Sequence, residues 1–506
     1  MSAKHEKALA TSDLRSLTSL KNATLQAGTH AFQSHPPVAA LQLALHQVIN
    51  RIPPSRAVGR TVTVSANLSS MRSATLLSFL FISFIMNTIA QTPAELVSMW
   101  EKEHVTNILP SNVRHKDLQK YLEGLKKLGI KVDEVGRSYA NREIYQAEFG
   151  KGPLKVFLWS QMHGDEPTAT SALIDIFTVL QKHRDKDWVR KIENAMTIRI
   201  VPMLNPDGAE IYQRRNLQGI DINRDALDLK TPEANLLKKL RDDWSPAIGF
   251  NLHNQNSLTT AGKTGKQAAI SFLVVYGDAA KTTNEGHERN KRLVSAMIAA
   301  IQPHMSGYIG KYGDEWTPTA FGDNFSAWGT PVILIETGML FGKDEMFLVK
   351  MNFTAILTAL KSLADGSEKT FSPVAYESLP NNSSGSLFYF IFRDATVIDR
   401  TTPNTPTTAD IGVNIERRRA EFVAPAYIRQ IGNLSSYFGL SEFDATNYFV
   451  VGRSAPSLKT GQFAELLFYK KSRTIDWSSP DLEKQFPPDA IFSFGKWLKG
   501  DIGSSK

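Results

Sequence analysis

The chain has 506 residues, of which 42% are hydrophobic and 21% charged, and its formal net charge is +8. This length is too great for one compact domain, so we expect a main domain of about 250–300 residues with additional parts. The composition excludes a fibrous, disordered or polytopic membrane protein for the bulk of the chain. Lysine and arginine are spread along the chain and no long basic run stands out, which argues against a nucleic-acid partner, because nucleic-acid binding needs clustered charge.

Cysteine is absent from the sequence. Disulfide bonds, cysteine nucleophiles and thiolate metal sites are therefore excluded. Any metal ion must be held by histidine and carboxylate side chains.

Residues 1–70 are rich in serine, threonine and alanine and show no apolar period. We expect them to be a disordered or non-native upstream extension that the mature protein does not contain.

The stretch from Met71 to Ala90 has the pattern of a secretory signal peptide. It begins with a basic residue, Arg72, continues as an apolar run, and ends with the small residues Thr88 and Ala90. We therefore expect a secreted, periplasmic or cell-envelope protein with no membrane span after cleavage. A membrane anchor, a buried core helix, or a cytoplasmic protein with a disordered leader are the alternatives.

From residue 95 onward the hydrophobic pattern predicts helices and strands. Two helical patterns lie between 95 and 127, and a hairpin follows over 131–149 with its turn at 139–142. Further expected strands are 154–159, 196–203, 248–252, 270–276 and 331–335, and further expected helices are 168–181, 232–241, 287–301 and 345–363. Apolar strands separated by helices indicate a sheet that is buried on both faces, which is the α/β class.

Residues 371–506 have a different texture. Turn residues gather at 381–385, β-like stretches follow at 387–392 and 396–399, and a Pro/Thr-rich patch covers 401–408. We expect a separate, smaller β-rich accessory domain here, without a motif that carries chemistry.

Candidate metal ligands follow two of the expected strands. His163 and Glu166 come after strand 154–159, at a corner where Pro167 opens a helix, and His253 comes at the end of strand 248–252. Ligands in α/β proteins bind beyond the carboxyl ends of strands. Two histidines and one glutamate form a ligand set of catalytic zinc, which lowers the pKa of bound water from about 15.7 to roughly 7. A lone His-x-x-Glu also fits a surface histidine beside a carboxylate at a helix start.

Five motifs occur in order at strand ends: HGDE at 163–166, NPDG at 205–208, GIDINRD at 219–225, NLHNQ at 251–255 and IETG at 335–338. This ordered set resembles the zinc carboxypeptidase superfamily typified by pancreatic carboxypeptidases A and B, across about residues 115–365, in a style closest to secreted bacterial members. The resemblance implies an α/β/α sandwich over 95–370, with a mixed, largely parallel twisted sheet. It also implies one zinc ion per chain and hydrolysis of a C-terminal peptide bond.

The resemblance also implies roles for individual residues. His163, Glu166 and His253 match the zinc ligands, and Glu336 matches the general base that takes a proton from zinc-bound water. Asp221 matches the carboxylate that accepts the second ring N–H of His163. A turn or N-cap aspartate is the alternative role of Asp221.

Three further residues match positions that bind the substrate. Asn223 and Arg224 match the pair that holds the terminal carboxylate of the substrate, and a structural ion pair is their alternative. Arg214 matches the arginine that polarises the scissile carbonyl, with its neighbour Arg215 as the competing choice.

The sequence departs from the family at the tyrosine that closes over the substrate. Residues 313–335 contain no tyrosine. Tyr312 or Tyr308 can serve only if the loop is arranged differently, and we expect Phe325 to line the pocket instead.

Two other functions stay open at this stage. One is an N-acyl amide hydrolase of the aspartoacylase and succinylglutamate desuccinylase branch, which NPDG and Thr337-Gly338 make less favourable than a peptidase. The other is an inactive, zinc-retaining binding module. The preferred C-terminal side chain, the choice between protein and cell-wall peptides, and the oligomeric state also stay open.

Overall fold

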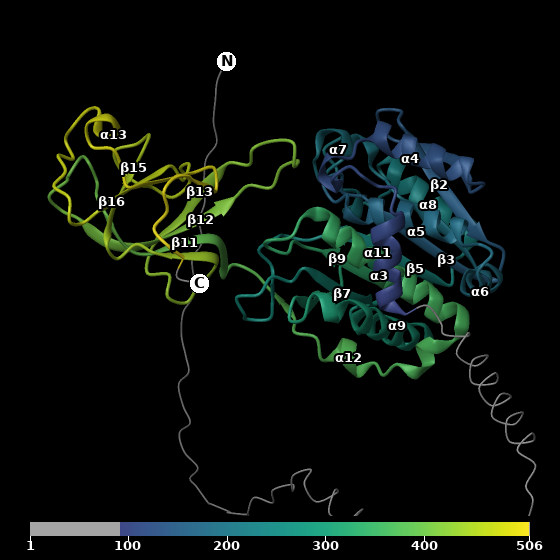
Figure 1. The fold of residues 1–506 in the computed structure, drawn as a ribbon. Helices are drawn as coiled ribbons and strands as arrows, with labels where there is room; N and C mark the ends of the chain where they lie inside the picture. The colour runs from purple at the N-terminus through teal and green to yellow at the C-terminus, as the bar shows by residue number, and fades with distance from the viewer. Residues whose placement is uncertain (1–91, 505–506) are drawn as a thin grey trace, which may run out of the picture. The chain divides into compact units, whose positions relative to one another are not determined.

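The computed structural model describes residues 92–504, so the predicted signal segment and the upstream extension lie outside the described residues. An eight-stranded sheet organises the first part of this range, and a second sheet the last part (Figure 1). In spatial order the strands of the first sheet are β1 (Lys131–Arg137), β2 (Glu143–Gly150), β4 (Met196–Val201), β3 (Leu154–Ser160), β5 (Ile248–Asn254), β9 (Val332–Thr337), β7 (Ile270–Val275) and β8 (Ile309–Lys311).

The first sheet is mixed, with its parallel part in the centre. β3 runs parallel to β4 and β5, and β9 runs parallel to β5. The expected hairpin forms as β1 and β2, and β7 is antiparallel to β9. The predicted α/β class and the mixed sheet are confirmed.

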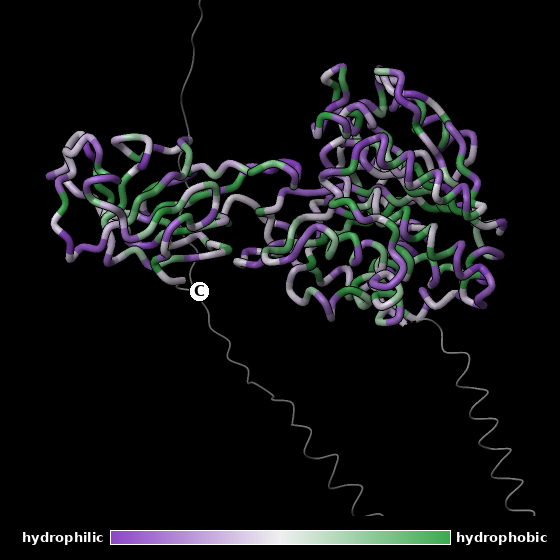
Figure 2. The backbone as a smooth tube through the Cα atoms, turned by 45° about the horizontal axis from the view of Figure 1, so that its top comes forward, coloured by the Kyte–Doolittle hydropathy of each residue, from purple (hydrophilic) through white to green (hydrophobic). Residues whose placement is uncertain are grey.

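Alternating side chains on the strands feed two separate cores. On β3, Val156 and Leu158 belong to one core, whereas Phe157 and Trp159 belong to the other. The first core is covered by α3 (Pro93–Glu103), α4 (His115–Lys127), α5 (Thr168–Lys182), α6 (Asp187–Ala195), α9 (Glu285–Ile301) and α11 (Glu345–Asp365). The second is covered by α8 (Pro232–Trp244) and α10 (Phe321–Ala327). Helices therefore lie on both faces, as in an α/β/α sandwich, and apolar residues gather along the inner strands (Figure 2).

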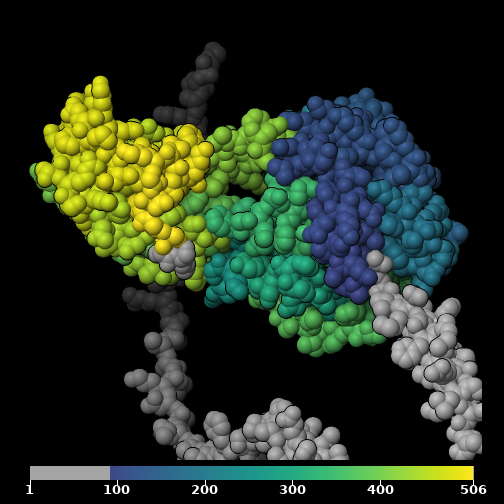
Figure 3. All heavy atoms as spheres, in the orientation of Figure 1, coloured from purple at the N-terminus to yellow at the C-terminus, as the bar shows by residue number. Residues whose placement is uncertain are grey.

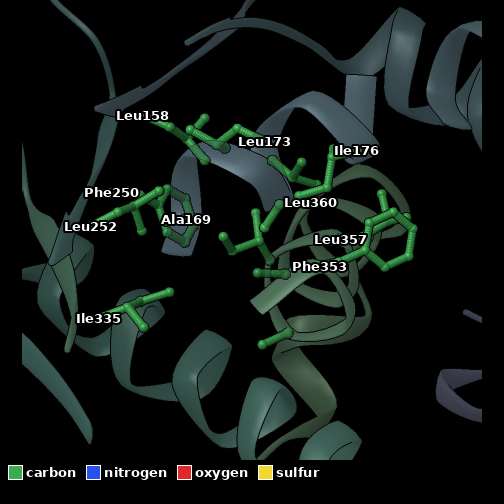
Figure 4. Close-up of a cluster of buried hydrophobic side chains, with 14 of the residues drawn as sticks. Leu158, Ala169, Leu173, Ile176, Phe250, Leu252, Ile335, Phe353, Leu357 and Leu360 are labelled. Atoms are coloured by element: carbon green, nitrogen blue, oxygen red, sulfur yellow. The ribbon is translucent and has the colours of Figure 1, made fainter. Parts of the chain in front are cut away.

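The larger core forms where the sheet meets α5 and α11. Leu158, Phe250 and Ile335 point from three neighbouring strands toward Leu173 of α5 and Phe353 of α11 (Figure 4). α11 is long and apolar enough to cross a membrane, but 72% of its most apolar window is buried inside the protein. Its composition is therefore that of a core helix.

Capping residues define both ends of α11. Asp344 caps α11 by accepting a hydrogen bond from the backbone N–H of Phe347 at 3.0 Å, and Gly366 ends the helix at a positive φ of 74°. α3 lies over this layer on the surface (Figure 3), where Trp100 donates to buried Asp175 at 2.9 Å.

A short segment links the two sheets. In α12 (Val374–Glu377) the hydroxyl of Tyr376 accepts the N–H of Val274 at 3.0 Å, and β10 (Asn382–Ser383) pairs with β6 (Thr260–Ala261). The boundary expected at residue 371 precedes α12, and the second sheet begins at Leu387.

The second sheet is β-rich, as expected, and has its own aromatic core. Its strands are β13 (Ala426–Gly432), β12 (Thr407–Ile415), β11 (Leu387–Val397), β15 (Tyr448–Gly452), β16 (Leu466–Lys470), β17 (Ala490–Ser493) and β18 (Lys496–Lys499), with β14 (Phe438–Asp444) paired to β11 and the helical turn α13 (Leu482–Gln485) outside the sheet. Phe392, Phe468, Phe492 and Trp497 pack together with ring centroids 5.0–5.9 Å apart.

Candidate metal centre

Strand register brings His253 and Glu336 together. β5 and β9 run parallel with His253 opposite Glu336. Their preceding neighbours, Leu252 and Ile335, point into the core with α5 and α11, so His253 and Glu336 point to the other face of the sheet. Both side chains are buried. The two candidate residues therefore meet at the carboxyl ends of two central strands, as the sequence predicted.

The corner that carries His163 and Glu166 is held by the NPDG motif. A Cβ atom on Gly164 would lie 1.9 Å from the carbonyl carbon of Gly208, so only glycine allows this close approach. Asn205 accepts the N–H of Gly208 at 2.8 Å and donates to the carbonyl of Met162 at 3.2 Å. The two motifs thus form one packed unit.

Three buried side chains converge on one point. Nδ1 of His163 lies 2.8 Å from Oε1 of Glu166, Nδ1 of His253 lies 2.7 Å from Oε2 of Glu166, and the two Nδ1 atoms are 3.2 Å apart. Within the described range, these residues offer one ligand atom each within 4.8 Å of one another. Two imidazole nitrogens and a carboxylate facing one point fit a zinc ion.

The second ring nitrogens support the same assignment. Nε2 of His163 donates to Oδ1 of Asp221 at 2.9 Å, which turns the lone pair of Nδ1 toward the other ligands. Nε2 of His253 is buried without a hydrogen-bond partner in the described part of the chain. The hydrogen bond to Asp221 therefore directs Nδ1 of His163 to the shared point, and no such contact within residues 92–504 orients the ring of His253.

Charges in the centre are strongly coupled. Burial opposes a charge on His163, but Glu166 and Asp221 raise its pKa to about 9. Burial also opposes the charge on Glu166, but His163 and His253 hold its pKa well below the ordinary value. Burial and then the Glu166 charge raise the pKa of Glu336 well above that of a free glutamate. Perturbed groups of this kind cluster at functional sites.

Asp221 fulfils both roles that the sequence left open. Besides His163, it accepts the backbone N–H of Asn223 at 2.9 Å and so caps the 3₁₀ helix Ile222–Arg224. Its Oδ2 accepts Nε of Arg214 at 2.9 Å. One carboxylate thus orients a histidine, a helical turn and an arginine.

The geometry separates Arg214 from Arg215. Nη1 of Arg214 lies 3.2 Å from Oε1 of Glu166 and 3.1 Å from Nδ1 of His163. Arg215 instead donates to the carbonyl of Gly219 at 3.0 Å and does not line the cavity at the centre. The structure therefore brings Arg214, and not Arg215, to the metal ligands.

A cavity of about 550 Å³ opens beside the three ligands and Glu336. Asn223 and Arg224 line it, and Oδ1 of Asn223 is fixed by the N–H of Phe321 at 2.9 Å. Arg224 is exposed and donates to the carbonyl of Asn223 at 2.8 Å, but it forms no ion pair within residues 92–504. Its guanidinium therefore has donors left for an anion in the cavity.

Phe325 does not line this cavity, and that expectation is wrong. Its side chain is fully buried, with its ring 4.4 Å from that of Trp159. Tyr312 lines the cavity instead, and the charge of Glu336 together with burial raises the pKa of Tyr312 to about 12. The apolar ring lies in the second core, and the residue with a hydroxyl faces the polar site.

Two functional candidates were missed by the sequence reasoning. The backbone N–H of Asn254 donates to Oε2 of Glu166 at 3.0 Å, a role that its place next to His253 could have suggested. Asp323 lines the cavity and accepts the N–H of Thr317 at 2.8 Å, and burial raises its pKa to about 6. No local pattern marks Asp323, because α10 was not predicted.

Comparison with known protein families covers the segment that carries His163, Glu166 and His253, but not Tyr312, Asp323 or Glu336. Residues 118–306 match the family described as zinc carboxypeptidase. A probable carboxypeptidase 2 of Trichophyton verrucosum is 31% identical over 188 residues, which are 37% of this chain and 34% of that protein. Carboxypeptidase E of Caenorhabditis elegans is 30% identical over 118 residues, which are 19% of this chain and 25% of that protein.

Among solved structures, a metallo-carboxypeptidase from Burkholderia cenocepacia matches with a TM-score of 0.42 and 17% identity, over 50% of this chain and 69% of that one. The chain spans about a third or less of the length of the curated relatives named above.

Proposed function

Because residues 118–306 match the family described as zinc carboxypeptidase, we propose that this chain is a zinc-dependent metallocarboxypeptidase that hydrolyses the C-terminal peptide bond of a peptide with a free carboxylate. One observation carries the proposal: His163, Glu166 and His253 converge on one buried point, in a cavity that Glu336 also lines. The four residues come from three separate parts of the chain, so a purely local structural role does not explain their meeting.

Each side chain has a task in this reaction. His163, Glu166 and His253 would hold a zinc ion, which would supply Lewis-acid polarisation and a lowered pKa of water. Glu336 accepts the proton of the attacking water and passes it to the leaving amine. Arg214, which also contacts Glu166 and Asp221, donates to the oxygen of the scissile carbonyl as negative charge develops there.

Asn223 and Arg224 bind the terminal carboxylate of the substrate. A planar guanidinium offers two parallel donors to a carboxylate, and Arg224 has unpaired donors at the cavity wall. This contact selects substrates with a free C-terminus. Tyr312, which also lines the cavity, covers the bound residue and donates a hydrogen bond through its hydroxyl, since its raised pKa keeps the hydroxyl protonated.

We further propose that the preferred C-terminal residue is basic. Asp314, Glu315 and Asp323 also line the cavity. Asp314 is paired with Lys281 at 2.7 Å, whereas Asp323 forms no ion pair within residues 92–504. An unpaired carboxylate in a partly buried wall favours a lysine or arginine side chain over an apolar one.

The activity is tested with peptide substrates and a chelator. We expect cleavage of C-terminal arginine from a blocked peptide, loss of cleavage with a chelator, recovery with zinc, and no cleavage by Glu336→Gln. N-acyl amino acids are assayed in parallel, and a preference for them over peptides would transfer the proposal to the amide-hydrolase branch. Cleavage that survives both the chelator and Glu336→Gln would refute the zinc mechanism.

We also propose that the protein is exported and cleaved after Ala90. The apolar stretch from Met71, followed by the small residues Thr88 and Ala90, supports this. Mass spectrometry of the mature protein tests the proposal. An N-terminus upstream of Met71 would contradict it.

A further inference from the structure

The hairpin of β12 and β13 in the second sheet ends in a long loop, residues 416–425, which we call the arm (Figure 1). Its sequence, ERRRAEFVAP, carries three consecutive arginines. In the first domain, the arm contacts the segments that border the metal centre.

Arg419 anchors the arm. Its side chain is buried and donates to the carbonyls of Ser111 at 2.9 Å, Ala209 at 2.5 Å and Glu210 at 3.0 Å. A buried guanidinium needs several partners to offset its desolvation, and three carbonyls provide them.

Backbone contacts add to this anchor. The N–H of Ala420 donates to the hydroxyl of Ser111 at 3.0 Å, and the N–H of Glu421 donates to Asn112 at 3.0 Å. Glu421 also pairs with Arg114 at 2.5 Å. The arm is therefore held along its length and not only at one residue.

Arg417 reaches the metal corner itself. Its Nη2 donates to the carbonyl of Asp165 at 2.5 Å, and its Nε donates to the hydroxyl of Tyr212 at 3.2 Å. Asp165 lies between the ligands His163 and Glu166 in the sequence. Arg417 of the arm therefore contacts a residue that is next to the proposed metal ligand Glu166 in the sequence.

Between the arm and the metal corner lies a second cavity, of about 480 Å³. Its volume is within the range of ligand pockets, about 300–1,000 Å³. It shares Asn254 and Gln255 with the cavity of the metal centre, but none of the residues that bind the substrate carboxylate. The residues that make its wall apolar include Met339, Phe341, Leu348, Tyr389, Ile415 and Ala420.

These observations define which part of a substrate can reach the second cavity. With the C-terminal carboxylate at Arg224 and the scissile bond at the metal ligands, the rest of the peptide must leave on the side away from Arg224. The second cavity adjoins the metal corner, where Pro167 and Thr168 line it directly after Glu166. A peptide that continues upstream of the scissile bond therefore passes along the arm.

We propose that the arm forms a binding site for apolar side chains upstream of the scissile bond, so that the second domain selects the substrate. This inference rests on the proposed carboxypeptidase function. Apolar side chains are the chemistry that fits, because the acidic groups at the wall are engaged: Asp344 caps α11, Glu345 accepts the N–H of Ser111 at 2.8 Å, and Glu416 faces Arg418 at 3.6 Å. The ammonium group of Lys343 lies over the ring of Phe347, 5.5 Å from its centroid. Burial of an apolar side chain there removes it from water.

The test uses the full chain and three peptides with the same C-terminal dipeptide: the N-acetyl dipeptide itself, a pentapeptide with leucines upstream, and a pentapeptide with glycines upstream. We expect the leucine peptide to have a kcat/KM about 10-fold or more above that of the glycine peptide. Ala420→Trp fills the cavity from an exposed position, and we expect it to bring the ratio of the two kcat/KM values close to 1. The matched control is Val423→Trp, because Val423 is on the same arm but does not line the cavity, and it keeps the ratio within about 2-fold.

Equal kcat/KM for the leucine and glycine peptides in the unmodified protein would overturn the inference. An equal loss on all three peptides in Ala420→Trp would do the same. Binding of the same peptides to Glu336→Gln, with and without Ala420→Trp, gives a readout that needs no turnover. A protein that binds the leucine peptide through the arm but cleaves nothing refutes the proposed function and leaves the arm site standing.

Discussion

Asp323 offers the most direct test of the cavity, through the substitution Asp323→Asn. Burial raises its pKa from 3.8 to about 6. The raised pKa means that ionisation costs the folded state free energy. In full this shift corresponds to about 3 kcal/mol, and solvent screening of a half-buried group reduces it to about 1–2 kcal/mol.

The sign follows from the two states. Below about pH 4 the carboxyl group is protonated in both the folded and the unfolded chain and has no effect on stability. Between pH 4 and 6 only the unfolded chain ionises, so the free energy of unfolding of the native protein decreases as pH rises. Above pH 6 the full cost is present. Asparagine keeps the acceptor for the N–H of Thr317 but carries no charge.

We therefore expect Asp323→Asn to be more stable than the native protein by about 1–2 kcal/mol at pH 8, with no difference near pH 4. Denaturant unfolding at a series of pH values measures this. Asp314→Asn is the control, because Lys281 lowers the pKa of Asp314. Removal of the Asp314 charge should therefore not increase the free energy of unfolding. Equal stability of Asp323→Asn and the native protein at pH 8 would refute the conclusion that burial of the Asp323 carboxylate destabilises the folded protein.

The same substitution tests the proposed substrate preference. The ratio of kcat/KM for C-terminal arginine over leucine should rise through pH 6 in the native protein, since Asp323 gains its charge there. In Asp323→Asn the ratio should be lower and independent of pH in this range. An unchanged preference for arginine in the variant would assign the specificity to another residue.

Three further substitutions test the metal centre. Glu336→Gln should lower kcat by about 10²–10⁴-fold while zinc content measured by mass spectrometry stays at one per chain, because Glu336 makes none of the ligand contacts; loss of zinc would assign it a ligand role. His253→Ala should weaken zinc binding by more than about 100-fold, measured by competition with a chelator, and unchanged affinity would exclude it as a ligand. Gly164→Ala should lower the free energy of unfolding by about 1–3 kcal/mol, measured by thermal unfolding, and should lower the zinc content, because the added Cβ overlaps Gly208. The control is Gly124→Ala, which should not lower the free energy of unfolding, because the added Cβ meets no atom within 4 Å.

The sequence was informative where function depends on strand ends. His163 follows β3, and His253 and Glu336 lie near the carboxyl ends of β5 and β9, whose parallel pairing brings these two residues together. The antiparallel course of β7 was not predicted, because an unbroken apolar strand has the same pattern in either direction.

Contacts between distant segments could not be read from the sequence. Arg417 and Asp165 are 252 residues apart, and no local pattern relates them. Tyr312 was set aside because its distance from Glu336 was counted along the chain, yet the irregular stretch between β8 and α10 returns it to the cavity. Phe325 was assigned to the cavity because α10, which turns its ring into the aromatic core, was not predicted.

The direct pairing of β5 with β9 has a consequence for redesign. Proton transfer and metal binding depend on the register between these two strands, where a slip of one residue in β5 would turn His253, or in β9 Glu336, to the opposite face. Asp323 and Arg417 lie outside this pair, on a short helix and on a loop. Laboratory evolution of new selectivity should therefore accumulate changes in those outer segments and leave the paired strands untouched.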